Sequence, residues 1–281
     1  MTEETHTEPE GVGAEDNQED RYLSSALARG LAIIRCFDQH HTELSLTEIA
    51  ELLGVSRSVP FRFVYTLEAL GYLRQDSHSK RYHLTPKVME LGYAYMQSLQ
   101  INDVVMPVLK QLRDSTGFSA HMGVLQGSSV VYVARVPATA ITSVNIHVGA
   151  RLPSHATAMG KVLLAYQPSS VVQALYGENR SLEVFTQNTK VSVEALLADL
   201  KAIRERGYAI SNEEFEYGIR SVAVPILNAR GESEAAINVA AIPSAVDGEK
   251  EVETMLPALK QAQDALESYL VHSGRTFDAE Y

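Results

Sequence analysis

Residues 45–71 constrain the fold more than any other part of the chain, because they carry the start and stop signals of two short helices. Ser45 and Glu48 have the spacing of a capping box, in which each side chain satisfies a backbone N–H at the helix start. Gly54 supplies the positive φ that ends the first helix. The second helix ends at Gly71. Two short helices joined by a tight glycine turn predict a helix-turn-helix.

The second of these helices has an apolar side and a polar side. Its predicted buried positions are Val59, Phe63, Leu67 and Leu70. Its predicted polar positions are Arg57, Ser58, Arg62 and Tyr65. An earlier helix carries apolar residues at helical spacing and is expected to lay that stripe across the other two. These stripe residues are Leu27, Leu31 and Ile34, with Phe37 beyond them.

Two short runs of aromatic and aliphatic residues follow, around the polar turn at 76–79. They predict a β-hairpin, or wing, with Lys80 and Arg81 at its tip. A winged helix-turn-helix would present its basic residues on the second helix and the wing. A generic helical hairpin with a surface ribbon would give a similar pattern, because short motifs also occur by chance.

The net charge of −11 argues against nucleic-acid binding by the whole surface. Eight acidic residues lie within residues 1–20, which contain no Lys or Arg, so the remainder is much less acidic. We expect residues 1–22 to form a disordered acidic tail. The chain shows neither the apolar core of a signal peptide nor a run long enough to cross a membrane, which predicts a cytoplasmic protein.

Thr85 and Pro86 have the character of an N-cap and first position, and predict a linker helix over 86–100. Its apolar face includes Tyr95, and Tyr93 lies nearby. This tyrosine-rich stripe would pack either on a second copy of the chain or on the chain's own second domain. Periodicity indicates burial and does not identify the partner.

Strands and helices mix from residue 102 onward. Strands are expected at 118–125, 130–136, 141–148, 208–210, 221–227 and 234–241. Helices are expected at 102–116, from 157, at 192–206 and through 270. The mixture predicts a mainly antiparallel sheet with helices packed on it. The fold class is therefore α+β, with a winged helix-turn-helix domain at 23–85, a second α/β domain at 101–273 and a C-terminal tail at 274–281.

Two of these strands share a face of small residues. This face presents Ser221 and Ala223 on one strand, and Ala236, Asn238 and Ala240 on the other. Such a face leaves volume and a few hydrogen-bonding groups for a small molecule. A helix packed closely over small residues would produce the same pattern. Residues 151–161 lead into a helix whose first turn favours an anion.

Enzyme motifs are weak in this sequence. No G-x-S-x-G elbow is present, and Ser154 directly precedes His155, which indicates no nucleophile–base pair. The histidines lack the spacing of metal ligands, so we expect neither a metal nor another cofactor. Glu213, Glu214 and Glu216 are expected to form a solvated acidic loop.

Three separated motifs, in order, resemble those of the IclR family of bacterial transcription regulators over about 22–273. SLTEIAELLGVSRS and YHLTPKVMELG are similar to the winged helix-turn-helix and linker of that family. RLPSHATAMGKVLLA is similar to the opening of its effector pocket, and GYAISNEEFEYGIRSVAVPILN to its C-terminal signature. YVARVP and HATAMGKVLLA resemble the branch that controls aromatic catabolism by the β-ketoadipate pathway.

The resemblance implies a GAF-like effector domain and homodimers, or dimers of dimers, on a palindromic operator in double-stranded DNA. The implied DNA-facing residues are Ser56, Arg57, Ser58, Phe61 and Arg62, to which the polar side of the helix and the wing add Tyr65, Lys80 and Arg81. The implied effector-facing residues are Ala158, Met159, Ser211, Ser221, Asn238 and Ala240.

We therefore expect a transcription regulator whose operator binding is controlled by a small organic acid, either aromatic or dicarboxylic. A DNA-binding adaptor without a ligand and a GAF-fold enzyme are the alternatives. Pro60 departs from the family, because this position of the recognition helix usually holds Thr, Ala or Val. Proline biases the preceding Val59 away from helix, so we expect the helix to begin at Ser58 rather than Ser56.

Overall fold

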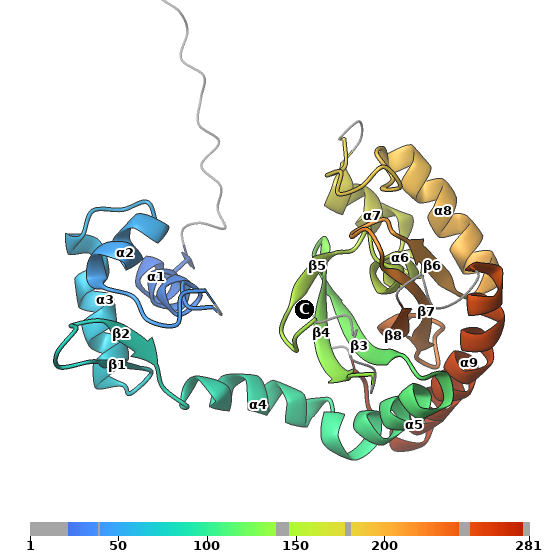
Figure 1. Cartoon of the computed structure of the whole chain (residues 1–281), viewed down its shortest axis with the longest axis horizontal. Coiled ribbons are helices and arrows are strands. Elements are labelled where there is room, and N and C mark those ends of the chain that lie inside the picture. The colour runs from blue at the N-terminus through green and yellow to red at the C-terminus, as the bar shows by residue number, and fades with distance from the viewer. Residues whose placement is uncertain (1–21, 39, 139–145, 178–180, 242–247, 278–281) are drawn as a thin grey trace, which may run out of the picture. The chain divides into compact units, whose positions relative to one another are not determined.

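The computed structural model describes residues 22–38, 40–138, 146–177, 181–241 and 248–277. The chain divides into two compact units, Met1–Gly92 and Tyr93–Tyr281. The division falls within helix α4, Val88–Ser98 (Figure 1). Within the described ranges, no helix combines the length and apolarity that a membrane span requires. The predicted acidic tail, apart from Tyr22, lies outside these ranges.

The first unit is a winged helix-turn-helix. Its elements are α1 (Ser25–Ile34), α2 (Leu46–Leu52), α3 (Ser58–Ala69), β1 (Leu73–Gln75) and β2 (Tyr82–Leu84). The capping box forms as predicted: the Ser45 N–H donates to Glu48 Oε2 at 2.7 Å, and the Glu48 N–H donates to Ser45 Oγ at 3.3 Å. Gly54 has φ of +65° after α2, where a side chain would be strained.

Helix α3 begins at Ser58, as predicted from Pro60. Val59 is nevertheless helical, so the expected bias of this residue away from helix is wrong. Pro60 lies in the first turn, where the N–H that proline lacks would have had no intrahelical acceptor. The first turn therefore accommodates the ring without loss of a helical hydrogen bond.

The buried side of α3 is rotated from the predicted one. Leu67 is buried as predicted, together with Pro60 and Val64. Leu70, predicted to be buried, is 53% exposed. The core of this unit lies between α3, α2, α1 and the wing, so the side of α3 that meets all of them is the buried one.

Helix α1 also differs from its predicted stripe. Ile33 is fully buried, whereas Leu27 and Leu31 are 65% and 47% exposed. The helical repeat predicted an apolar face correctly, but only part of that face packs within this unit. The remainder borders a groove between α1 and α3.

The second unit is built on one antiparallel sheet of order β5-β4-β3-β8-β7-β6. Its strands are β3 (Ser119–Gln126), β4 (Ser129–Val136), β5 (Arg151–Pro153), β6 (Ala209–Asn212), β7 (Arg220–Leu227) and β8 (Ser233–Ala241). Every neighbouring pair in this sheet is antiparallel. The predicted sheet type is therefore confirmed.

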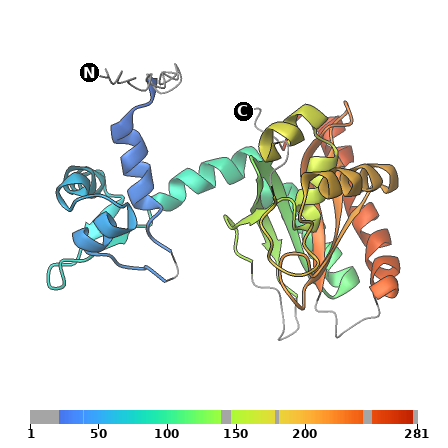
Figure 2. The same ribbon diagram turned by 90° about the horizontal axis from the view of Figure 1, so that it is seen from above.

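Helices cover both faces of the sheet (Figures 1 and 2). They are α5 (Met106–Thr116), α6 (Ala158–Ala165), α7 (Ser169–Tyr176), α8 (Val193–Arg206) and α9 (Gly248–Ser273), and a π-helical turn at Ile101–Val105 precedes α5. One face packs Met122, Val224 and Ile237 against α5 and α9. The other packs Tyr132 and Ala223 against α6 and α8.

Three details of this unit differ from expectation. Residues 141–145 of the predicted strand 141–148 lie outside the described residues, the rest of it is not strand, and the edge strand is β5. Helix α7 was not predicted. The predicted tail at 274–281 begins as packed structure, because the buried Phe277 donates its N–H to Glu234 Oε2 at 2.6 Å.

Candidate functional site

The outward side of α3 gathers the DNA-facing residues implied by the sequence. Phe61 and Tyr65 are 56% and 66% exposed, and Ser58 and Arg62 are also exposed. Val64, on the opposite side, fixes α3 in the core and so holds these four side chains outward. Aromatic and basic groups on one exposed helix are suited to sugar, phosphate and base contacts.

Ser56 and Arg57 lie just before α3. Arg57 occupies the N-cap position without a side-chain cap, and Ser56 Oγ lies 3.2 Å from Ser58 Oγ. Both residues are exposed. They adjoin the four outward residues of the helix as the sequence implied.

The two wing residues predicted to face DNA, Lys80 and Arg81, have different surroundings. Lys80 is exposed at the hairpin, with a left-handed φ of +58°. The guanidinium of Arg81 instead lies 2.8 Å from a Glu48 carboxylate oxygen and 3.2 Å from Glu43. The Ser45 N–H and Arg81 together lower the pKa of Glu48 to about 2. Arg81 therefore ties the wing to α2, whereas the sequence analysis placed it among the DNA-facing residues.

An apolar groove of about 830 Å³ runs between α1 and α3. Its apolar lining includes Leu27, Leu31, Ile34, Phe63, Leu70 and Leu91. Leu91 belongs to the first turns of α4 within the same unit, and it is 54% exposed. Exposed apolar side chains that gather in one groove are typical of an interaction site, whereas single exposed leucines are ordinary.

The effector-facing residues implied by the sequence meet on one face of the sheet. Strand register places Ser211 opposite Ser221, Ser221 opposite Ala240, and Ala240 opposite Ser119. Asn238 lies on the same face, two residues from Ala240. We call Ser211, Ser221, Asn238 and Ala240 the serine row. Ser211, Ser221 and Ala240 are between 5% and 8% exposed.

The start of α6 is joined to the serine row. Ser211 Oγ donates to the backbone oxygen of Ala156 at 3.2 Å. Thr157 caps the helix by accepting the Gly160 N–H at 3.2 Å, and Ala158 and Met159 follow it fully buried. A Cβ at Gly160 would lie 2.2 Å from Ser154 Cα, so glycine permits this close turn. Further along the small face, Ala223 and Ala236 pack beneath α6, which fills that part with helix.

His121 is a buried residue of this face that the sequence reading did not assign. It pairs with Asn238 in register, and its Nδ1 lies 3.0 Å from Asn238 Oδ1. Its ring meets Tyr132 edge-on at 5.6 Å. The spacing of the histidines along the chain does not indicate this position, but the alternation of Ser119, His121 and Gly123 places His121 on one face of a strand.

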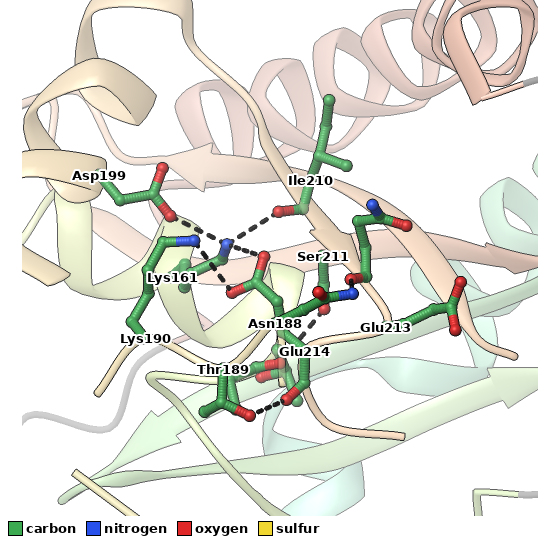
Figure 3. Close-up of polar contacts among 12 residues, drawn as sticks. Lys161, Asn188, Thr189, Lys190, Asp199, Ile210, Ser211, Glu213 and Glu214 are labelled. Carbon is green, nitrogen blue, oxygen red and sulfur yellow. Dashed lines mark hydrogen bonds and ion pairs between the residues drawn. The ribbon is translucent and has the colours of Figure 1, made fainter. Parts of the chain in front are cut away.

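A buried ion network fixes α6 from its other side (Figure 3). Lys161 is 1% exposed, and its Nζ lies 2.9 Å from Asp199 Oδ2, 2.7 Å from Glu214 Oε1 and 2.8 Å from the Ile210 oxygen. The Glu214 backbone oxygen accepts from Thr189 Oγ1 at 2.6 Å. Glu214 is 5% exposed, so its prediction as a solvated loop residue is wrong. The network joins α6, α8 and β6, the elements around the serine row.

The second half of the linker helix packs on the second unit. Leu99 is buried, and Tyr95 and Met96 pack against the core that α5 and α9 share. Gln100 then adopts a left-handed φ of +51°, and its Oε1 accepts from the hydroxyl of Tyr269 on α9. Tyr93 remains 54% exposed. The chain's own second domain is thus the partner of the C-terminal part of the stripe.

Comparison with known families decides the class of protein. The family model for the C-terminal domain of the bacterial transcriptional regulator IclR matches residues 93–268. The family model for the IclR helix-turn-helix domain matches residues 26–77. The chain belongs to the IclR family. The resemblance seen in the sequence is confirmed, as is the expected order of helix-turn-helix and effector domains.

Characterised IclR regulators align over almost all of this chain. XynR, a helix-turn-helix transcriptional regulator of Escherichia coli, is 35% identical over 87% of this chain and 96% of its own length. The p-hydroxybenzoate hydroxylase transcriptional activator of Acinetobacter baylyi is 33% identical over 90% of this chain and 94% of its own. The protein is therefore an IclR-type transcriptional regulator with a DNA-binding helix-turn-helix.

A solved structure of another bacterial transcriptional regulator shows the same fold. Transcriptional regulator RHA06195 from Rhodococcus sp. RHA1 is 35% identical and superimposes with a TM-score of 0.78, covering 89% of this chain and all of that one.

Proposed function

We propose that this regulator binds a palindromic operator as a homo-oligomer in the cytoplasm, and that a small organic acid bound at the serine row controls that binding. The supporting observation is the meeting of Ser211, Ser221 and Asn238 with the start of α6 on one sheet face. The name of the Acinetobacter relative links it to p-hydroxybenzoate metabolism, which favours an aromatic acid here.

The start of α6 offers donors to a carboxylate. The first N–H groups of a helix have no intrahelical acceptor. Thr157 accepts the Gly160 N–H with its side chain and the Lys161 N–H with its backbone oxygen. Among the described residues this leaves the N–H groups of Ala158 and Met159 for a ligand. The helix dipole adds a favourable interaction with negative charge at the same place.

The outward side of α3 is proposed to read the operator, with Lys80 on a phosphate. Arg62→Ala is expected to weaken operator binding by about 1–3 kcal/mol and to relax the preference at one base pair, because a guanidinium pairs with two acceptors of guanine. Anisotropy titrations of operator variants measure both effects. Arg35→Ala, which removes an exposed charge at the end of α1, is the matched control. Equal losses of operator affinity in Arg62→Ala and Arg35→Ala would show that α3 does not read the bases.

The groove between α1 and α3 is proposed to hold a second copy of the chain. A palindromic site presents its half-sites to two recognition helices, and a two-fold interface uses the same patch on both copies. The exposed leucines of α1 and Leu91 supply one continuous patch of this kind.

Leu31→Lys is expected to shift the assembly to a smaller species and to weaken operator binding by about tenfold or more. The substitution removes from each copy one leucine that the proposed interface would bury, and full burial of a leucine is worth about 1.5–3 kcal/mol. Sedimentation velocity at micromolar protein measures the mass. Val271→Lys alters an equally apolar residue, 63% exposed on α9, and serves as the control. An unchanged mass in Leu31→Lys would exclude this groove as the interface.

A further inference from the structure

His121 carries a ring nitrogen, Nε2, that is buried away from solvent. The side chain is fully buried, and among the described residues its Nε2 has no hydrogen-bond partner. Buried polar atoms in native proteins are almost always paired. Because His121 lies on the same sheet face as the proposed effector-facing residues, Nε2 is a candidate to be paired by a bound ligand.

The protonation state of the ring follows from its surroundings. Burial, with the nearby Arg135 charge, lowers the pKa of His121 to about 4, so the ring is neutral at pH 7. Asn238 Oδ1, 3.0 Å from Nδ1, can only accept a hydrogen bond. The ring proton therefore lies on Nδ1, and Nε2 presents a lone pair. That lone pair accepts an O–H or N–H and disfavours a carboxylate.

The position of His121 connects it to the proposed ligand site. Ser119, two residues earlier on the same face of β3, lies in register with Ala240 of the serine row. Two residues later, a Cβ at Gly123 would lie 3.2 Å from Met159 Cε, so the first turn of α6 reaches this strand. His121 thus lies between the serine row and the side chain of Met159.

We propose that His121 accepts a hydrogen bond from a hydroxyl group of the effector, so that the site selects hydroxy acids over the corresponding acids without the hydroxyl. This inference rests on the proposed ligand site, whose helix start would take the carboxylate. Asn238 acts on the ligand through His121, because its Oδ1 fixes the proton on Nδ1. The carboxylate of the ligand would therefore meet N–H donors at the start of α6, and its hydroxyl would meet a nitrogen acceptor on β3.

Matched pairs of acids test this selection. Calorimetric titrations of the full-length protein would compare 3- and 4-hydroxybenzoate with benzoate, and malate with succinate. Wild type is expected to bind a hydroxy acid at least about tenfold tighter than its partner, because a buried acceptor left unpaired is costly. His121→Leu is expected to reduce that ratio to about twofold or less. His121→Gln, which keeps an acceptor, is expected to preserve most of the ratio.

The outcomes separate the two proposals. Binding of a pair with equal affinity by wild type, or an unchanged ratio in His121→Leu, overturns the role of His121 and leaves the ligand site in place. Failure of every acid to bind overturns the ligand site itself. Nitrogen NMR of labelled histidine adds a readout independent of affinity: Nε2 is expected to be unprotonated at pH 7 and to shift on hydroxy-acid binding, and a protonated Nε2 would contradict the assignment.

Discussion

Lys161→Met is expected to lower the free energy of unfolding by about 3–5 kcal/mol, the range measured when one partner of a buried ion pair is removed. The variant leaves Asp199 and Glu214 side by side, with their side chains only 18% and 6% exposed. Lys190, at 3.9 Å from Glu214, is too distant and too exposed to replace the lost ammonium.

Two further variants, measured by urea denaturation, test whether the loss of stability comes from the unpaired buried charges. Lys201→Met removes an exposed lysine from α8 and is expected to cost about 0.5 kcal/mol or less. The triple variant Lys161→Met, Asp199→Asn, Glu214→Gln leaves no unpaired charge and is expected to recover part of the loss. A loss in Lys161→Met no larger than that in Lys201→Met would show that the network is not needed for stability.

Ser221→Phe is expected to abolish the response to the effector while operator affinity stays near that of the ligand-free protein. Ser221 is 8% exposed at the centre of the serine row, so a phenyl ring would occupy the space proposed for the ligand. Loss of a ligand's van der Waals fit in this way should weaken binding by about 100-fold or more, equivalent to about 2.7 kcal/mol.

Ser221→Ala and Ser170→Phe are the companion variants. Ser221→Ala removes only the hydroxyl and is expected to weaken ligand binding by about 0.5–1.5 kcal/mol, which keeps the test valid should the larger side chain unfold the domain. Ser170→Phe places the same ring on the exposed part of α7 and should change neither the operator affinity nor the response to the effector. A wild-type response in Ser221→Phe would locate the effector elsewhere.

Local signals in the sequence predicted local structure well. Ser45, Glu48 and Gly54 each act on backbone groups within four residues, so their spacing alone predicts the helix boundaries that are observed. The same holds for the strands around the serine row, whose alternation places Ser221 and Asn238 on one face.

Features that depend on distant residues were not predictable in this way. One partner of Lys161 is Glu214, 53 residues later, and no periodicity joins them. The His121–Asn238 pair forms only when β3 pairs with β8, and whether Nε2 finds a partner depends on all the elements that bury the ring. The exposure of Leu27 and Leu31 depends on which side of α1 meets α3, which helical spacing leaves open.

The proposed function requires that one ligand change the affinity of the protein for one DNA sequence. Such coupling exists only if the ligand prefers one of the arrangements that the oligomer can adopt. Gln100, whose Oε1 accepts from the Tyr269 hydroxyl, fixes the end of the linker helix to α9.

Fluorescence anisotropy of palindromic fragments taken from the DNA next to the gene, measured at fixed salt with and without the hydroxy acid found by calorimetry, tests the central claim most directly. We predict binding at least about 1,000-fold tighter than to a scrambled fragment. We also predict a change of about fivefold or more on saturation with the acid. Equal affinity for both fragments, or an affinity that the bound acid leaves unchanged, would contradict the account.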